Sequence, residues 1–182
     1  KGTTEVDKFA FEVAPNESFI VYAHIVDKAG NEIYLSSNGV IVDDKAPEGD
    51  NYSPNIDITL PKTNANGFYN DSVEVKFKVV EPKYIGAATK DQEKGVYSGI
   101  KEITYVIKAD DLNATETDSF DLSKGSVVDE NGLLSSWTGS IEIDKDKFNS
   151  NNVIVTITAV DNAGNVRTST TKIGDIQIDV TA

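Results

Sequence analysis

The sequence predicts an all-β protein built as an antiparallel β-sandwich, and three observations lead to this prediction. Apolar and polar residues alternate over many short segments, so that each segment presents apolar side chains on one face. Clusters of Gly, Asn and Asp separate these segments as turns do. No segment has the i, i+3, i+4 apolar spacing of a long helix. About seven short strands of this kind are typical of a sandwich with Greek-key links.

The alternation also places the strands in order along the chain. The first part supplies three, at about 4–13, 18–26 and 32–43. The second part supplies six, at about 55–60, 72–80, 100–109, 138–144, 152–160 and 166–180, the last with a break near Gly174. A short additional strand is predicted near 118–122. We expect the inward side chains to be Val75, Phe77, Ile103, Tyr105, Ile141, Ile143, Val155 and Ile157.

One ending occurs twice in the sequence. The turn Asp27-Lys28-Ala29-Gly30-Asn31 returns as Asp161-Asn162-Ala163-Gly164-Asn165, at a spacing of 134 residues. Asp43 matches Asp179 at a spacing of 136 residues. A self-match of this length indicates a tandem array. The repeat divides the chain into residues 1–48, the C-terminal part of one module, and residues 49–182, a complete module. We expect 1–48 to pack with strands outside this sequence.

Composition excludes several classes of function. The 182 residues contain no Cys, so disulfides and thiol-based sites are excluded. Acidic residues outnumber basic ones by 30 to 17, which argues against a nucleic-acid partner because phosphate binding depends on Lys and Arg. No window approaches the roughly 20 apolar residues of a membrane span, so we expect no membrane insertion.

The repeated turn and the acidic ending resemble the bacterial immunoglobulin-like modules of surface proteins and large adhesins. Those modules end one strand with a D-x-A-G-N turn and finish the next with an acidic residue followed by T-A-P. Residues 178–182 read Ile-Asp-Val-Thr-Ala, and 42–47 read Val-Asp-Asp-Lys-Ala-Pro. The resemblance implies tandem immunoglobulin-like sandwiches, the first incomplete. It also implies an extracellular place on a Gram-positive type of bacterial surface or cell wall.

The function that this resemblance implies is structural, namely a spacer or stalk whose partners are neighbouring domains of the same polypeptide. An alternative is an adhesin module that binds a glycan or a host surface protein through two long loops, 81–99 and 109–136. In that alternative Trp137, Tyr84 and Tyr97 form a stacking platform for sugar rings. The other interpretation of Trp137 is packing at the edge of the core.

We expect no enzymatic activity. His24 is the single histidine, and its matching position in the second copy is Thr158. Its neighbours Ala23 and Ile25 alternate inward, so His24 is expected to face outward. No phosphate loop, nucleophile elbow or zinc-protease motif is present.

No cofactor is required by the sequence, but a calcium site is predicted at the junction between the modules. The linker enters at the end of the sandwich that also carries the Asp161 turn. Asp43, Asp44 and Asp50, together with Glu48, should therefore lie near Asp161, and calcium takes six to eight oxygen ligands. Related adhesin modules stiffen their junctions with calcium, so the resemblance points the same way. The alternative is a solvated acidic linker beside an Asp that caps its own turn.

Overall fold

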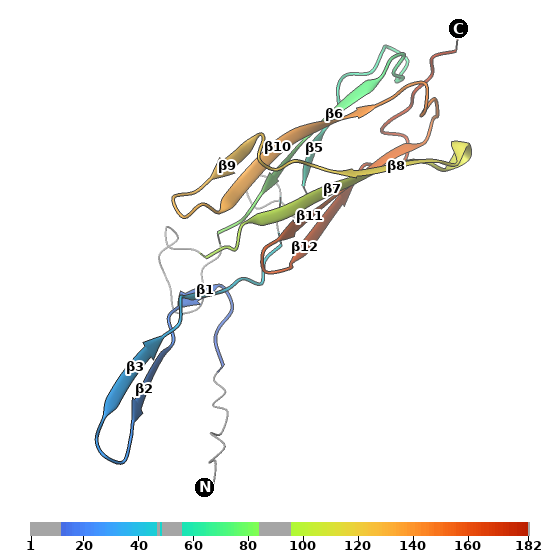
Figure 1. Ribbon diagram of the computed structural model, residues 1–182. Helices are drawn as coiled ribbons and strands as arrows, with labels where there is room; N and C mark the ends of the chain where they lie inside the picture. Colours follow the sequence, from blue (N-terminus) through green and yellow to red (C-terminus); the bar gives the residue numbers. More distant parts are fainter. Residues whose placement is uncertain (1–11, 47, 49–55, 84–95, 182) are drawn as a thin grey trace.

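The computed structural model describes residues 12–46, 48, 56–83 and 96–181. The molecule is elongated, with a broad sandwich at one end and a narrow part, residues 12–46, at the other (Figure 1). The narrow part ends in a hairpin that points away from the sandwich, and the C-terminus lies at the opposite end of the long axis (Figure 1).

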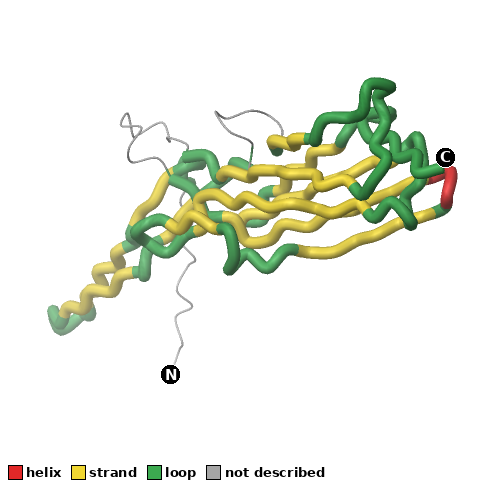
Figure 2. Tube along the Cα trace, turned by 90° about the horizontal axis from the view of Figure 1, so that it is seen from above, coloured by secondary structure: helices red, strands yellow, loops and turns green. Residues whose placement is uncertain are grey.

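The sandwich consists of two four-stranded antiparallel sheets, so the predicted all-β class is confirmed. One sheet has the order β5 (Asp57–Thr59), β6 (Val73–Val80), β10 (Leu134–Ile143) and β9 (Ser126–Val128). The other has the order β12 (Val166–Thr170), β11 (Val153–Asp161), β7 (Ile100–Ala109) and β8 (Ala114–Ser119). The strands run along the long axis of the molecule (Figure 2).

Alternation fixes which side chains fill the space between the sheets. Along β11 every second residue is fully buried, because a strand presents successive side chains to opposite faces. Seven of the eight predicted core residues are buried. Tyr105 is the exception: its ring packs against the core while its hydroxyl donates to Glu116 at 3.3 Å. The predicted facing of the strands is therefore confirmed.

The segment 109–136 differs from the expected long loop. It contains the 3₁₀ helix η3 (Asp110–Leu112), β8 and β9, in place of the single short strand predicted near 118–122. β8 overlaps the predicted strand only at residues 118–119, because its sequence, ATETDS, has no apolar alternation to mark its start. β8 is an edge strand whose side chains are mostly exposed, so it can form without alternating apolar residues. Its backbone hydrogen bonds are made with β7.

The predicted strand 166–180 is also interrupted. β12 ends at Thr170, and Gly174 adopts a positive φ of 86° before the chain returns to a bridge between Val153 and Ile176. Glycine adopts a positive φ with little steric strain, because it has no Cβ. The break in the strand therefore lies near Gly174, as expected. No helix among the described residues is long and apolar enough to cross a bilayer.

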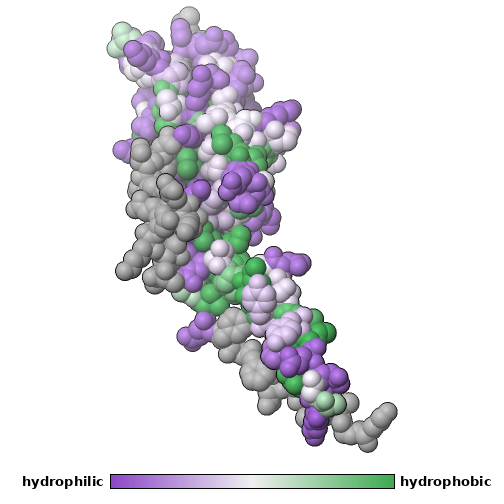
Figure 3. Space-filling model, turned by 90° about the vertical axis from the view of Figure 1, so that its left-hand side faces the viewer, coloured by the Kyte–Doolittle hydropathy of each residue, from purple (hydrophilic) through white to green (hydrophobic). Residues whose placement is uncertain are grey.

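The narrow part contains two strand pairs. β1 (Glu17–Phe19) pairs with β4 (Val40–Val42), and β2 (Tyr22–Val26) pairs with β3 (Glu32–Ser36). The two strands expected at 18–26 and 32–43 are thus each divided in two, because the chain changes partner between the pairs. The apolar side chains of this part are largely exposed, and Figure 3 shows apolar surface on the narrow region.

The narrow part repeats the hydrogen bonds of the sandwich. Val21 N–H donates to Ser37 Oγ at 3.0 Å, and its counterpart Val155 N–H donates to Thr171 Oγ1 at 3.0 Å. The pairing of Phe19 with Val40 has its counterpart in the bridge between Val153 and Ile176. The two turns repeat each other as well, as shown by Asn31 Nδ2 donating to Asp27 Oδ2 at 2.7 Å and Asn165 Nδ2 donating to Asp161 Oδ2 at 2.8 Å.

The repeated segments differ in what covers them. Ile157 and Ala159 of β11 are fully buried beneath the second sheet, whereas Ile25, the counterpart of Ala159, is 51% exposed. Likewise Ile176 is fully buried and its counterpart Val40 is 37% exposed. The same local sequence therefore forms the same local hydrogen bonds in both places, and the described structure completes a core around only one of them.

Candidate metal centre

Three buried carboxylates meet where the narrow part joins the sandwich. One carboxylate oxygen from each of Asp43, Glu81 and Asp161 lies within 4.8 Å of the other two. Their side chains come from residues far apart in the sequence, and all three residues are buried. Carboxylates are rarely buried without compensation, because the loss of hydration strongly disfavours their charged form. The cluster therefore calls for an explanation.

Each carboxylate is placed by the end of a strand. Asp43 directly follows β4, Glu81 directly follows β6, and Asp161 is the last residue of β11. β1, which pairs with β4, lies at the end of the sandwich where β11 turns into β12 (Figure 1). The topology thus delivers one residue from the narrow part and one from each sheet to the same point.

Hydrogen bonds fix two of the three side chains. Asp43 Oδ2 accepts from Ser98 N–H at 2.7 Å, and its Oδ1 accepts from Lys45 N–H at 3.0 Å. Asp161 Oδ1 accepts from Asn165 N–H at 2.8 Å, and Asn165 Nδ2 donates to Asp161 Oδ2 at 2.8 Å. Each of these oxygens retains a second lone pair. Both carboxylates are therefore oriented and still able to bind a cation.

Glu81 is different. It is 3% exposed, and neither of its carboxylate oxygens has a hydrogen-bond partner among the described residues. The pKa of Glu81 is raised from about 4.5 to about 9, chiefly by burial and also by the negative charges of Asp43 and Asp161. A buried acceptor without a partner normally costs on the order of 1–3 kcal/mol. A ligand that supplies positive charge would remove this cost.

The donor set decides which cation fits. The three side chains supply only oxygen, which favours calcium and magnesium over zinc and copper, whose protein sites contain mainly nitrogen and sulfur ligands. Calcium tolerates irregular geometry and mixes monodentate with bidentate carboxylates. Glu81, with both oxygens unpartnered, can serve as a bidentate ligand. The three carboxylates thus form a donor set of the kind that calcium takes, between the narrow part and the sandwich.

A second contact holds the linker beside this cluster. Arg167 Nη2 donates to Glu48 Oε1 at 2.9 Å, and the Glu48 side chain is 10% exposed. Glu48 also exchanges two backbone hydrogen bonds of 2.7 Å with Val80, the residue before Glu81. Glu48 therefore extends the sheet of β6 by one bridged residue beside the cluster.

The structure brings together some of the predicted metal ligands and separates others. Asp43 and Asp161 lie together as expected. Asp44 does not join them, because it is exposed and pairs with Lys45 at 3.4 Å. Glu48 is bound by Arg167 instead. Asp50 lies outside the described residues.

Glu81 was missed by the sequence analysis, although one signal pointed to it. It is the first residue after the apolar run of β6, at the end of the sandwich that receives the linker. Its burial could not be anticipated, because an acidic residue at a strand end is usually solvated. In the structure Glu81 lies beside Asp43 and Asp161 and follows Val80, which bridges to Glu48.

Two of the three aromatic residues proposed for glycan stacking, Trp137 and Tyr97, are used in packing. Trp137 is 4% exposed, and its ring lies against Phe77 and Phe120 at centroid distances of 5.4 and 4.8 Å. Tyr97 is 5% exposed, and its hydroxyl donates to Asp129 Oδ2. Neither ring has an open face for a sugar, so the structure supports the packing interpretation. Tyr84 lies outside the described residues.

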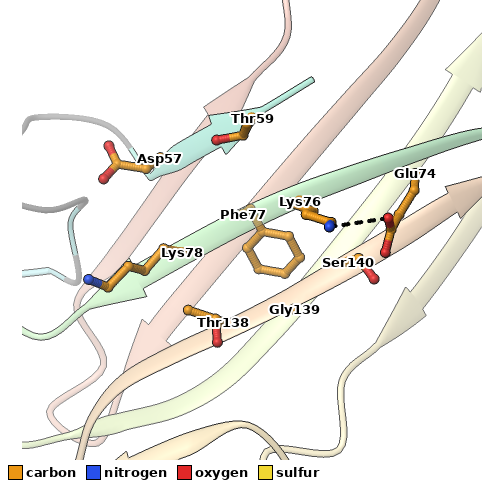
Figure 4. A pocket seen from close by; sticks show the side chains of 9 residues that line it. All are labelled: Asp57, Thr59, Glu74, Lys76, Phe77, Lys78, Thr138, Gly139 and Ser140. Carbon is orange, nitrogen blue, oxygen red and sulfur yellow. Dashed lines mark ion pairs between the residues drawn. The ribbon is translucent and has the colours of Figure 1, made fainter. Parts of the chain in front are cut away.

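An open depression on the β5, β6 and β10 face offers no comparable site. Figure 4 shows side chains of both signs around it, with Lys76 paired to Glu74 at 3.4 Å. Both side chains are more than half exposed, and the Phe77 residue beside them is 4% exposed. The depression therefore has no group of like-charged side chains pointing to one place, and no exposed aromatic ring that a ligand could stack on.

His24 lies on the exposed hairpin as expected. Its ring stacks on Tyr34 at a centroid distance of 4.2 Å, and its Nε2 lies 3.1 Å from Glu32 Oε2. These are pairings across two neighbouring strands, which stabilise the hairpin.

No model of a known protein family matches the chain, and no curated protein sequence matches it.

Proposed function

We propose that this chain is a structural spacer of immunoglobulin-like modules, part of an extracellular bacterial surface protein, whose junction is held rigid by a calcium ion. The observation that carries the proposal is the meeting of Asp43 with Glu81 and Asp161. Asp43 belongs to the narrow part, and the other two belong to the sandwich. An ion bound by all three joins the two parts directly, and a projecting stalk requires that kind of restraint.

The remaining features of the junction support a rigid spacer as well. Asn165 Nδ2 donates to the carbonyl of Asp43 at 3.0 Å, and Arg167 pairs with Glu48. The sandwich strands run along the molecular axis, so the two ends of the described structure are far apart (Figure 2). The repeated turn and ending favour an array, in which each module adds length.

Calcium contributes to the junction by neutralising charge. Three carboxylates within 4.8 Å of one another repel when ionised, and burial strengthens the repulsion. Binding of the ion converts this repulsion into attraction and supplies partners for both Glu81 oxygens. A ligand that binds only the folded state stabilises it by mass action. The melting temperature should therefore rise with calcium concentration.

Calorimetric titration and thermal melting with calcium, with magnesium and with chelator test this proposal. The native chain should bind one calcium ion and melt at a higher temperature in its presence. Glu81→Gln and Asp161→Ala should lose both the heat of binding and the calcium-dependent rise. Asp44→Ala is the matched control, because Asp44 adjoins a ligand but points to solvent, and it should keep both responses.

Two outcomes would contradict the proposal. If calcium leaves the melting temperature of the native chain unchanged, the cluster does not bind it. If Glu81→Gln and the native chain respond equally, calcium binds elsewhere. The adhesin alternative is not favoured by the described aromatic residues, since Trp137 and Tyr97 are both buried.

A further inference from the structure

We propose that the bond between Asn38 and Gly39 is a site of spontaneous covalent modification, at which the chain rearranges through a cyclic imide to an aspartyl or isoaspartyl linkage. The sequence contains three Asn-Gly pairs, at 38–39, 66–67 and 131–132. A following glycine leaves its amide nitrogen open to approach, because it has no Cβ. The three pairs differ in what their glycine amides bind. The modification needs no metal, so it is independent of the proposed calcium junction.

The reaction is an intramolecular substitution. The main-chain nitrogen of Gly39 attacks Cγ of Asn38, and a succinimide ring closes. The bond from Cγ to the side-chain nitrogen breaks, and that nitrogen leaves as ammonia with the proton that the attacking nitrogen loses. Water then adds to either ring carbonyl and opens the ring. One direction of opening leaves an ordinary aspartyl residue, and the other leaves an isoaspartyl residue, whose main chain passes through the former side chain.

The other two pairs lie in turns of one kind. Asn64 and Asp129 begin these turns, and the side-chain oxygen of each accepts from the amides two and four residues later, at 2.8 to 3.0 Å. Gly67 N–H donates to the Asn64 carbonyl at 3.1 Å, and Gly132 N–H donates to the Asp129 carbonyl at 3.1 Å. An amide bonded to a carbonyl loses its proton only when the turn opens. Both pairs are therefore protected from the reaction while the chain is folded.

The pair at 38–39 lies outside such a turn. Among the described residues the Gly39 N–H contacts only the Ser37 hydroxyl, at 3.4 Å, which is long for a hydrogen bond. The same hydroxyl accepts a shorter bond from Val21 N–H, at 3.0 Å. No described residue forms a hydrogen bond with the Asn38 side chain, and both members of the pair are exposed. The nitrogen is thus able to lose its proton to water and attack.

The rearrangement affects one strand pair and spares the other. Residues 37–39 connect β3 to β4, and β4 pairs with β1 from Val40 onward. An isoaspartyl residue adds a methylene group to the main chain of this link. The pairing of Phe19 with Val40 lies next to it, so the lengthened chain no longer fits the register of β1 and β4. The β2–β3 hairpin precedes the link and keeps its register. β4 ends directly before Asp43, so loss of the pairing removes a restraint on that residue.

Peptide mapping by mass spectrometry tests the assignment, after the whole chain is incubated in mildly alkaline buffer. Conversion of amide to acid is followed at all three Asn-Gly pairs, in native buffer and in denaturing urea. In urea the three pairs should react at comparable rates, because no turn protects any of them. In the native chain the pair at 38–39 should react about tenfold faster than either of the others, the factor that one protecting hydrogen bond supplies.

Hydrogen exchange tests the structural consequence. In the incubated chain the backbone amides of β1 and β4 should exchange faster than in fresh protein, whereas those of β2 and β3 should not change. Asn38→Gln is the matched control, because glutamine must close a larger ring and reacts far more slowly, so its incubated chain should exchange like fresh protein. Equal native rates at the three pairs, or a faster reaction at 66–67 or 131–132, would overturn the assignment. Unchanged exchange in β1 and β4 of the modified chain would overturn the consequence.

Discussion

Asn165 donates its side-chain amide to the backbone carbonyl of Asp43 at 3.0 Å, across 122 residues of sequence. The same nitrogen lies 2.8 Å from Asp161 Oδ2. One amide group therefore serves both its own turn and the linker that approaches it. The turn is a local motif, but its asparagine also positions the neighbouring part of the molecule. This double role makes Asn165 a sensitive probe of the junction.

Asn165→Ala should lower the free energy of unfolding by about 1–3 kcal/mol, because it leaves the buried Asp161 carboxylate and the Asp43 carbonyl without their shared donor. Urea denaturation measures the change. Asn31→Ala is the matched control, because Asn31 makes the equivalent hydrogen bonds in an exposed turn. This substitution should lower the free energy of unfolding by less than Asn165→Ala does. Equal losses in the two variants would mean that the contact with Asp43 contributes nothing.

Phe77→Ala should lower the free energy of unfolding by about 3–5 kcal/mol, because it creates a cavity beneath Trp137 and Phe120. Denaturant melts followed by tryptophan fluorescence report both the stability and the local packing. Lys76→Ala, one residue earlier on the exposed face, should change stability by about 0.5 kcal/mol or less. A loss near zero for Phe77→Ala would show that this part of the core is loosely packed.

Gly139→Ala should destabilise the sandwich by about 1–3 kcal/mol through overpacking. An added Cβ would lie 2.1 Å from Cη2 of Trp137, because the indole ring lies directly over the glycine. The fluorescence of the tryptophan should shift to longer wavelength as the ring is displaced. Trp137→Leu should remove most of the penalty, so the double variant should be less destabilised than the sum of the single ones. Additive losses would contradict the proposed clash.

The metal-free protein should lose stability as the pH rises. Burial raises the pKa of Glu81 to about 9 in the folded state, above its ordinary value near 4.5. The folded state therefore binds the proton more tightly than the unfolded state does. The resulting stability is fully present below about pH 4.5 and is lost progressively up to about pH 9, by at most about 1.4 kcal/mol per pH unit.

Thermal melting in chelator between pH 5 and 9 measures this dependence. Glu81→Gln keeps the size of the side chain but cannot ionise, so its melting temperature should depend less on pH than that of the native chain. Glu102→Gln, on the exposed side of β7, is the control for removing a negative charge. Identical pH profiles for native and Glu81→Gln would show that the Glu81 carboxyl does not titrate differently in the two states.

The sequence alone determined the strand pattern and the facing of the core. Period-two alternation identifies which side of β6, β7, β10 and β11 is buried, and this depends only on the geometry of a strand. The self-match between the turns at Asp27 and Asp161 was equally local, since the hydrogen bonds that the two turns have in common lie within five residues. Hence the same sequence forms the same turn whether it is covered or exposed.

Two features became visible only in the tertiary structure: the edge strand β8 and the burial of Glu81. An edge strand such as β8 has no apolar alternation in its sequence. It is recognised as a strand only from its backbone pairing with β7. Glu81 becomes a candidate ligand because it is buried beside Asp43 and Asp161, which are far from it in the sequence, whereas Asp44 is exposed. Burial depends on which distant segments arrive at a point. A carboxylate's role at this junction therefore follows from long-range packing, which local patterns do not encode.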